Sequence, residues 1–147
     1  MNLPAGLRAA ALSDEQPPDR FVRLRSELGV SSFGLNQIVL EPGQRNRIHR
    51  HAVQQEVYVV LDGVLTLIVE GESYEFGRGE IVSVEPQVRR QLVNRGPRRL
   101  SLLALGGMPA HEHEPRDAEP YSDWSEREPG SLQSVPVPED LPSGELA

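Results

Sequence analysis

Short apolar runs alternate with turn residues over residues 20–107. The runs are rich in Val, Ile, Leu, Phe and Tyr, and Gly or Pro separates them, which predicts short β-strands joined by tight turns. The expected strands cover residues 21–28, 33–40, 56–61, 64–70, 73–76, 80–84, 89–93 and 99–105. Asp62-Gly63 is a strong hairpin signal between two of them. Strands at this spacing predict an all-β sandwich or barrel.

One of these strands has no polar position over residues 57–61, which read Val-Tyr-Val-Val-Leu. An antiparallel strand with one face in water would alternate apolar and polar residues. We therefore expect one face of this strand to line the core and the other to pack on a second sheet or on a partner chain. The second possibility favours a homodimer.

The two ends of the chain differ in composition from the expected barrel. Residues 1–19 are predicted to form an irregular arm that Pro17 and Pro18 close, because proline breaks regular structure. Residues 20–107 form the expected barrel. Residues 108–147 hold seven of the thirteen prolines and ten of the twenty-two acids. This composition predicts an acidic, Pro-rich tail that is partly disordered.

Composition excludes several classes of protein. The absence of Cys and Lys rules out disulfides, thiolate metal sites and lysine Schiff-base chemistry. No apolar run approaches the length of a membrane span, and the N-terminus lacks the apolar core of a signal peptide. The net charge is −7, and no basic patch is interleaved with aromatic residues. We therefore expect a cytoplasmic protein that binds neither nucleic acid nor membrane.

Candidate chemistry is concentrated in His49-Arg50-His51 and Glu56. Residues i and i+2 of a strand face the same way, so both imidazoles would point to one side. Glu56 opens the next expected strand and can approach the same point. Two histidines and one carboxylate form a ligand set for a divalent transition metal that leaves coordination positions open. These nitrogen and oxygen ligands suit Mn, Fe, Co, Ni, Cu or Zn and do not choose among them.

Residues 43–63 read GQRNRIHRHAVQQEVYVVLDG, which is G-x5-H-x-H-x4-E-x6-G. This segment resembles the first conserved motif of the cupin superfamily at every signature position. The resemblance covers roughly residues 30–106 and implies an antiparallel jelly-roll barrel. It also implies that His49, His51 and Glu56 hold a metal inside that barrel.

The second cupin motif is only partly present in residues 79–94, GEIVSVEPQVRRQLVN. Its histidine, the family's fourth metal ligand, is missing. Counted from Gly79 or Asn94 the position belongs to Arg90, and counted from Pro86 it belongs to Gln91. A bulge reconciles the two counts. We expect Gln91 to face the metal as a weak fourth ligand, because an amide oxygen can ligate and a guanidinium cannot. An inward Arg90 would instead oppose a cation and favour an anionic ligand.

Other residues near the motif have ordinary interpretations that compete with functional ones. His111-Glu112-His113 repeats the His-x-His pattern in acidic, Pro-rich surroundings, which favours a solvated tail. Alternatively, the tail folds over a barrel mouth and supplies the missing ligand.

One of the arginines around the motif could orient an anionic substrate, although solvation or acid pairing is the usual state. These arginines are Arg45, Arg47 and Arg50.

The sequence thus predicts a barrel that holds a divalent transition metal and binds a small polar molecule. An enzyme would be of the dioxygenase or isomerase type, since both occur among cupins, and no catalytic residue beyond the ligands is identified. The alternative is a metal-free or non-catalytic cupin that binds a small molecule, in particular an anion.

Overall fold

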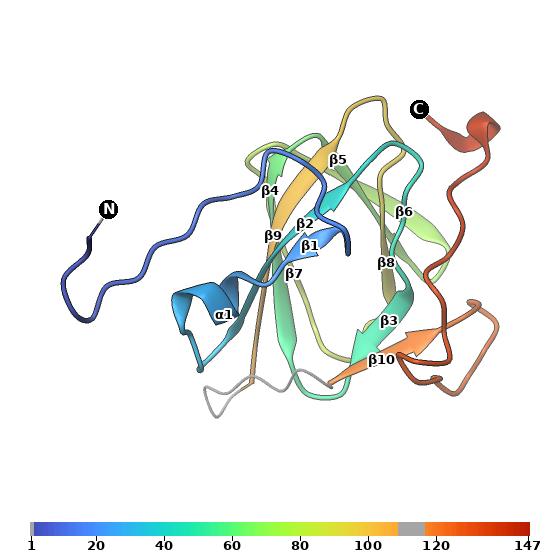
Figure 1. Ribbon diagram of the computed structural model, residues 1–147. Coiled ribbons are helices and arrows are strands. Elements are labelled where there is room, and N and C mark those ends of the chain that lie inside the picture. The colour runs from blue at the N-terminus through green and yellow to red at the C-terminus, as the bar shows by residue number, and fades with distance from the viewer. Residues whose placement is uncertain (1, 109–116) are drawn as a thin grey trace.

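The structure is a computed structural model that describes residues 2–108 and 117–147. Two five-stranded antiparallel sheets face each other (Figure 1). The first has the order β1 (Phe21–Val22), β2 (Gly34–Leu40), β9 (Leu100–Gly107), β4 (Gln55–Asp62) and β7 (Ile81–Val84). The second has the order β10 (Ala118–Tyr121), β3 (Ile48–His51), β8 (Arg90–Val93), β5 (Val64–Val69) and β6 (Glu72–Gly77). This is the all-β jelly roll that the sequence predicts.

Period-two alternation places the core between the sheets. In β9, Leu100, Leu102 and Ala104 are buried, whereas the intervening side chains are half-buried. The inward residues of the other strands join them: Leu40, Tyr58, Val60, Leu65, Leu67, Val84 and Leu92. The outward Val57 and Val59 of β4 remain half-buried in this single chain. The homodimer that this second apolar face favours stays a prediction.

The segment expected to be a strand over residues 21–28 has a different structure. Only Phe21–Val22 pair with β2, and helix α1 (Leu24–Leu28) follows. Leu24 and Leu28 are four residues apart and therefore share one face of the helix. Gly29, at φ 66°, ends the helix with its N–H directed at Arg25 O and Ser26 O. The strand prediction was wrong here because the apolar spacing fits both periods over so short a stretch.

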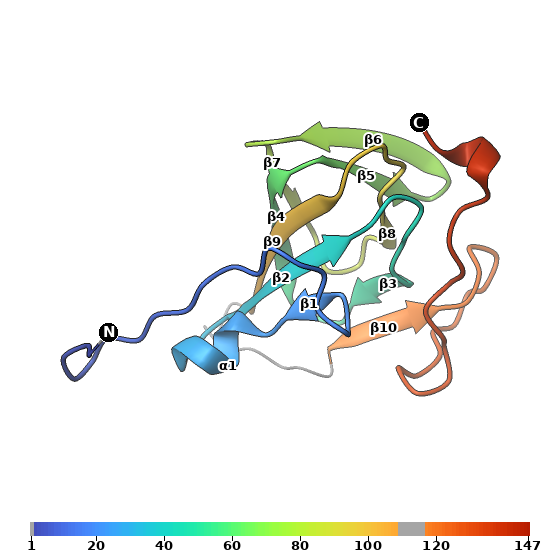
Figure 2. The ribbon, with the colours of Figure 1, turned by 45° about the horizontal axis from the view of Figure 1, so that its top comes forward.

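Both ends of the chain attach to the barrel. The N-terminal arm attaches through Ser13 to Gln37 of β2. The Gln37 side chain accepts from Ser13 N at 2.8 Å and donates to Ser13 O at 3.0 Å. The C-terminal segment supplies β10, which lies beside β3 at the edge of the second sheet (Figure 2). It ends in a 3-10 turn, η1 (Ser143–Glu145). Part of the expected tail is therefore a strand of the barrel.

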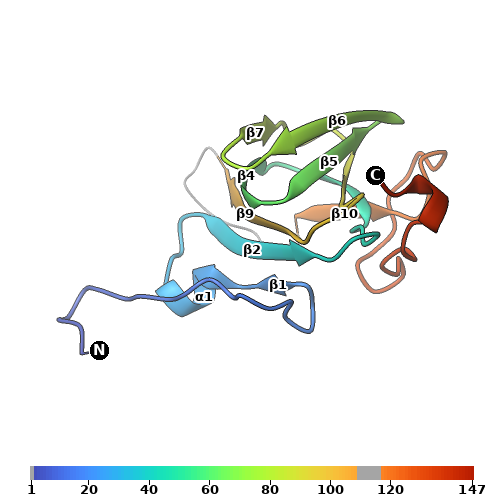
Figure 3. The same cartoon turned by 90° about the horizontal axis from the view of Figure 1, so that it is seen from above.

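The two ends lie on opposite sides of the molecule (Figure 3). The N-terminal arm extends from the side of β1 and β2, and the C-terminal segment runs along the side of β10 (Figure 3). Within the described residues, none of the helices has both the length and the apolar character that crossing a lipid bilayer requires.

Replacement of Tyr121 by Ala tests the docking of the C-terminal segment. Tyr121 is 2% exposed, and the Arg89 guanidinium lies 5.0 Å from its ring centre. Tyr121→Ala should lower the free energy of unfolding by about 3 kcal/mol or more, because a large buried ring is lost. Tyr74→Ala is the matched control, since Tyr74 is 52% exposed. Its effect should stay within about 0.5 kcal/mol in urea titrations. Equal effects of the two variants would contradict the docking of β10.

Candidate metal site

His49, His51 and Glu56 meet inside the barrel, as the sequence predicts. Both histidines point inward from β3, and Glu56 points inward from β4. His51 Nε2 lies 3.1 Å and His49 Nε2 lies 3.7 Å from Glu56 Oε1. One ligand atom from each residue falls within a span of 4.8 Å. These side chains are between 11% and 15% exposed, so a cation held there would be largely shielded from water.

Each imidazole faces an oxygen atom at the ring nitrogen that points away from Glu56. His49 Nδ1 lies 3.0 Å from Arg47 O, which can only accept a hydrogen bond. His51 Nδ1 is buried and lies 3.3 Å from Asp117 Oδ2, within ion-pair distance but outside hydrogen-bond geometry. Acceptors at Nδ1 favour the tautomer with its proton there and a lone pair on Nε2. In the metal-free protein the two Nε2 atoms face the Glu56 carboxylate and can donate to it. With the proton on Nδ1 instead, their lone pairs and the carboxylate would converge on one place and fit a metal cation.

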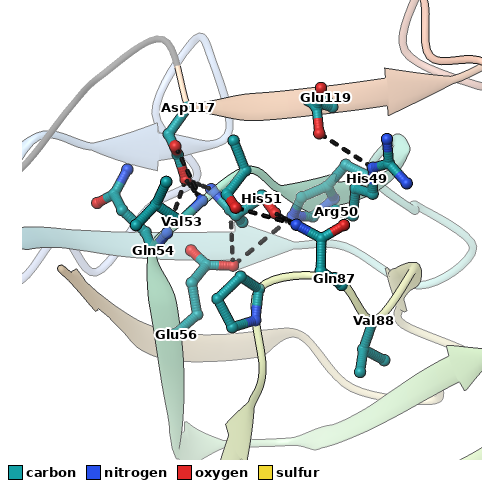
Figure 4. A network of polar contacts seen from close by, with 12 residues as sticks. His49, Arg50, His51, Val53, Gln54, Glu56, Gln87, Val88, Asp117 and Glu119 are labelled. Carbon is teal, nitrogen blue, oxygen red and sulfur yellow. Dashed lines mark hydrogen bonds and ion pairs between the residues drawn. The ribbon is translucent and has the colours of Figure 1, made fainter. Parts of the chain in front are cut away.

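Asp117 is a residue of the candidate site that the sequence did not indicate. It precedes β10 and is buried, and its carboxylate accepts from Gln54 N at 2.9 Å and from Val53 N at 3.2 Å. Figure 4 shows this carboxylate facing the turn after β3 and the ring of His51. No local motif marks Asp117, which is 63 residues away from Gln54 along the chain. His111 and His113, the candidates singled out in this region, lie outside the described residues.

Arg90 takes the position of the family's fourth ligand. It is directly opposite His49 in the pairing of β3 with β8, so both side chains share the inner face. Its guanidinium is fully buried and donates to Glu56 Oε1 at 2.6 Å and to Tyr58 OH at 3.3 Å. Its remaining contacts are with two backbone carbonyls, Val88 O at 2.8 Å and Pro86 O at 3.3 Å.

Gln91 does not reach the metal position, contrary to our expectation. It follows Arg90 in β8 and therefore faces the other side of the sheet. Its amide donates to Asn46 O at 2.9 Å, and it lines a separate cavity beside Tyr121 and Trp124. The count from Gly79 and Asn94 is the one that the structure follows.

Burial and hydrogen bonding shift the pKa values of Glu56, His49 and Tyr58 in this cluster. Burial disfavours the charged form of Glu56, but hydrogen bonds with His49 and His51 outweigh it and hold the Glu56 pKa well below its usual value. Burial lowers the pKa of His49, which is therefore neutral near pH 7. Burial and the nearby Glu56 charge raise the pKa of Tyr58, so its hydroxyl keeps the proton that it donates to Glu56 at 2.6 Å.

Arg90 keeps its positive charge. Burial would lower its pKa, but Tyr58 and Glu56 outweigh that effect and raise it. The charges of Arg90 and Glu56 therefore cancel before any metal binds. A divalent cation on His49, His51 and Glu56 would add positive charge that this ion pair does not offset, and an anionic ligand in the open coordination positions would balance it.

A cavity of about 420 Å³ opens above the three predicted ligands. Arg45 and Arg47 line it, as the sequence allowed, whereas Arg50 does not. Arg50 donates instead to Glu119 at 3.0 Å, and Figure 4 shows this pair on the β10 side of β3. The volume suits a small molecule of the size that ordinary ligand pockets hold.

Comparison with protein families matches residues 36–106 to the family described as Cupin domain. An uncharacterized protein of Methanocaldococcus jannaschii is 24% identical over 80 residues, which are 54% of this chain and 63% of that protein. The match thus spans less than two thirds of this relative.

Two solved structures illustrate the structural similarity. A cupin protein of Bacteroides fragilis has a TM-score of 0.64 and 16% identity, with 76% of this chain and 92% of that chain covered. A proposed sugar phosphate isomerase of Acidithiobacillus ferrooxidans has a TM-score of 0.54 and 27% identity, with 58% of this chain and 56% of that chain covered.

Removal of the Glu56 charge tests the buried ion pair. Glu56→Gln should lower the free energy of unfolding of metal-free protein by about 3 kcal/mol, because it leaves Arg90 buried without a counter-charge. Glu70→Gln is the control: Glu70 pairs with Arg89 at 2.7 Å, but its side chain is 56% exposed. Its loss should cost about 1 kcal/mol or less in urea titrations.

The double variant Glu56→Gln/Arg90→Met separates loss of the pair from loss of packing. It should recover most of the stability, since replacing a whole buried ion pair by uncharged groups is often close to neutral. A double variant no more stable than Glu56→Gln would show that the unpaired guanidinium is not the cause of the loss.

Proposed function

We propose that the barrel binds a divalent transition metal on His49, His51 and Glu56, as the match of residues 36–106 to the Cupin domain family suggests. The observation that carries the proposal is the convergence of two Nε2 atoms on Glu56, with an oxygen atom beside each Nδ1. Two imidazoles and one carboxylate whose ligand atoms lie within 4.8 Å of one another form a ligand set for a divalent transition metal. The neutral state of His49 suits a ligand, because a metal displaces no proton from it.

Each surrounding residue has a separate role in this site. Asp117 holds the orientation of His51, and Arg47 O holds that of His49. Arg90 and Tyr58 both donate to Oε1 of Glu56, which holds the carboxylate beside the two imidazoles. The metal would supply Lewis-acid polarisation of an oxygen of the bound molecule.

We further propose that the bound molecule is small, polar and anionic, and that isomerase-type chemistry is the activity to test first. The cavity volume and the uncompensated charge of a metal-loaded site support the ligand class. The similarity to the proposed sugar phosphate isomerase supports the reaction class. Dioxygenase chemistry requires an iron-type metal at the same ligands and is the second reaction to test.

A non-catalytic binding protein is the alternative, and one observation favours it. Apart from the three predicted ligands, Asp19 is the one remaining acid or histidine that lines the cavity within the described residues. Proton transfer during isomerisation needs a positioned acid or base that is not already used as a ligand. Sequestration or sensing of an anion needs none.

Metal content tests the central proposal. Protein purified without a His tag and incubated with Mn, Fe, Ni or Zn salts should retain about one equivalent of metal per chain by elemental mass spectrometry. His49→Ala should lose it, because one of the two imidazole ligands is removed. Arg50→Ala, the neighbouring change on the other face of β3, should keep it. Absence of metal from the parent protein under every condition would leave the anion-binding alternative.

The role of Asp117 is tested by metal affinity. Asp117→Asn should weaken metal binding about 10- to 100-fold, because the carboxylate that orients His51 becomes a neutral amide. Glu119→Gln is the matched control, since Glu119 pairs with Arg50 rather than with a ligand. Competition with a metal-sensitive dye measures both. An unchanged affinity of Asp117→Asn would remove Asp117 from the site.

A further inference from the structure

Five arginines line the cavity that leads to the metal ligands. They come from two separate parts of the chain, the segment before and within α1 and the segment that leads into β3. We call this set the arginine wall: Arg20, Arg23, Arg25, Arg45 and Arg47. The described acids of the same lining are Asp19 and Glu56, and Glu56 is already paired with Arg90.

Two members of the wall are half-buried and fixed in direction. Arg47 Nε donates to Val135 O at 2.6 Å, and Arg45 Nε donates to Glu139 O at 2.9 Å. Neither guanidinium has a described carboxylate within ion-pair distance. Each is thus held at Nε by a backbone carbonyl of the C-terminal segment, and its two terminal nitrogens are left for another acceptor. Positioned, partly desolvated arginines of this kind recognise carboxylate or phosphate groups bidentately.

The remaining members have longer contacts, and Arg25 donates to Val30 O at 3.4 Å. Arg20 lies 3.9 Å from Asp140 and donates to Arg45 O at 3.5 Å. Arg23 lies over the ring of Phe21, 4.6 Å from its centre. The ion pair and the hydrogen bond of Arg20 are at the long end of their distance ranges, so they compete weakly with an incoming anion. The ring beneath Arg23 carries no negative charge and does not neutralise it.

Elsewhere in the molecule, arginines do find acids. Arg50 pairs with Glu119, Arg89 with Glu70, Arg90 with Glu56 and Arg99 with Glu41. The chain has 22 acids against 15 arginines, so acids are not scarce. The cavity wall thus gathers five arginines for which the described residues provide one long ion pair, Arg20 with Asp140 at 3.9 Å.

We propose that the arginine wall binds the phosphate group of a small phosphate monoester whose other end reaches His49, His51 and Glu56. A phosphate monoester carries close to two negative charges near neutral pH and presents three acceptor oxygens. It can therefore satisfy several guanidinium groups at once, whereas a single carboxylate matches one fork. The orientation toward the metal rests on the proposed function, but phosphate capture by the wall does not require a metal.

Calorimetric titration with ribose 5-phosphate, ribose and malonate tests this assignment on the full chain. Ribose 5-phosphate should bind, and ribose should bind at least about tenfold more weakly, because it lacks the charge-assisted hydrogen bonds. Raising the salt concentration should weaken ribose 5-phosphate binding. Tighter binding of malonate would overturn the phosphate assignment in favour of a dicarboxylate, and equal binding of ribose would overturn the anion subsite.

Arg47→Gln and Arg45→Gln should each weaken ribose 5-phosphate binding about tenfold or more. Arg50→Gln is the matched control. It removes the same charge, and Arg50 lies between His49 and His51 in the sequence, but its side chain is outside the cavity. Its affinity should stay within about twofold of the parent, since only a screened long-range charge is lost. Equal losses in all three variants would show a general charge effect and contradict the subsite.

Two further variants keep the test independent of folding and of metal. Arg47→Lys retains the charge without the planar fork, and it should bind more weakly than the parent and more tightly than Arg47→Gln. His49→Ala should still bind ribose 5-phosphate through the wall, even without metal. If the parent protein holds no metal but binds ribose 5-phosphate, and Arg45→Gln and Arg47→Gln weaken that binding, the metal proposal fails and the subsite stands. If metal binds and ribose 5-phosphate does not, the subsite fails alone.

Discussion

The buried ion pair between Arg90 and Glu56 is the contact on which the site depends. Arg90 is fully inaccessible to water, so its charge needs a close counter-charge and partners for its other N–H groups. Glu56, Tyr58 OH and the carbonyls of Pro86 and Val88 provide them. The pair fixes the Glu56 carboxylate beside both imidazoles. The positive charge of Arg90 also balances the negative charge of Glu56. The charge of a divalent cation at this place would therefore not be offset by Glu56 and would attract an anion.

The C-terminal segment is part of the site although the family match ends at residue 106. Its strand β10 pairs with β3, which carries both histidines, and Asp117 lies against His51. Farther along, the carbonyls of Val135 and Glu139 hold two arginines of the cavity wall. The segment therefore contacts both the candidate metal ligands and the arginines of the cavity wall, from outside the part of the chain that matches the family.

The acids of the C-terminal segment and the arginines of the cavity wall have different kinds of partner. The acids that the C-terminal segment contributes near β3 pair with groups outside the cavity or hold a ligand, as Glu119 and Asp117 do. The arginines of the cavity wall, by contrast, are held mainly by backbone carbonyls and an aromatic ring, which orient a guanidinium without cancelling its charge. The entrance is thus positive in a chain whose net charge is −7.

The sequence by itself determined most strands of the two sheets and the convergence of His49, His51 and Glu56. Both follow from local rules, since alternation sets the facing of strand residues and the turn between β3 and β4 brings Glu56 back to the histidines. Local rules were insufficient in four places, and the first is β10, a strand within the expected tail. Residues 21–28 fit either a strand or a helix, and Arg90 and Gln91 fit the same gap in the motif. Asp117 carries no motif at all. Only the tertiary structure decided these, because strand register and long-range packing set which side chain a buried carboxylate meets.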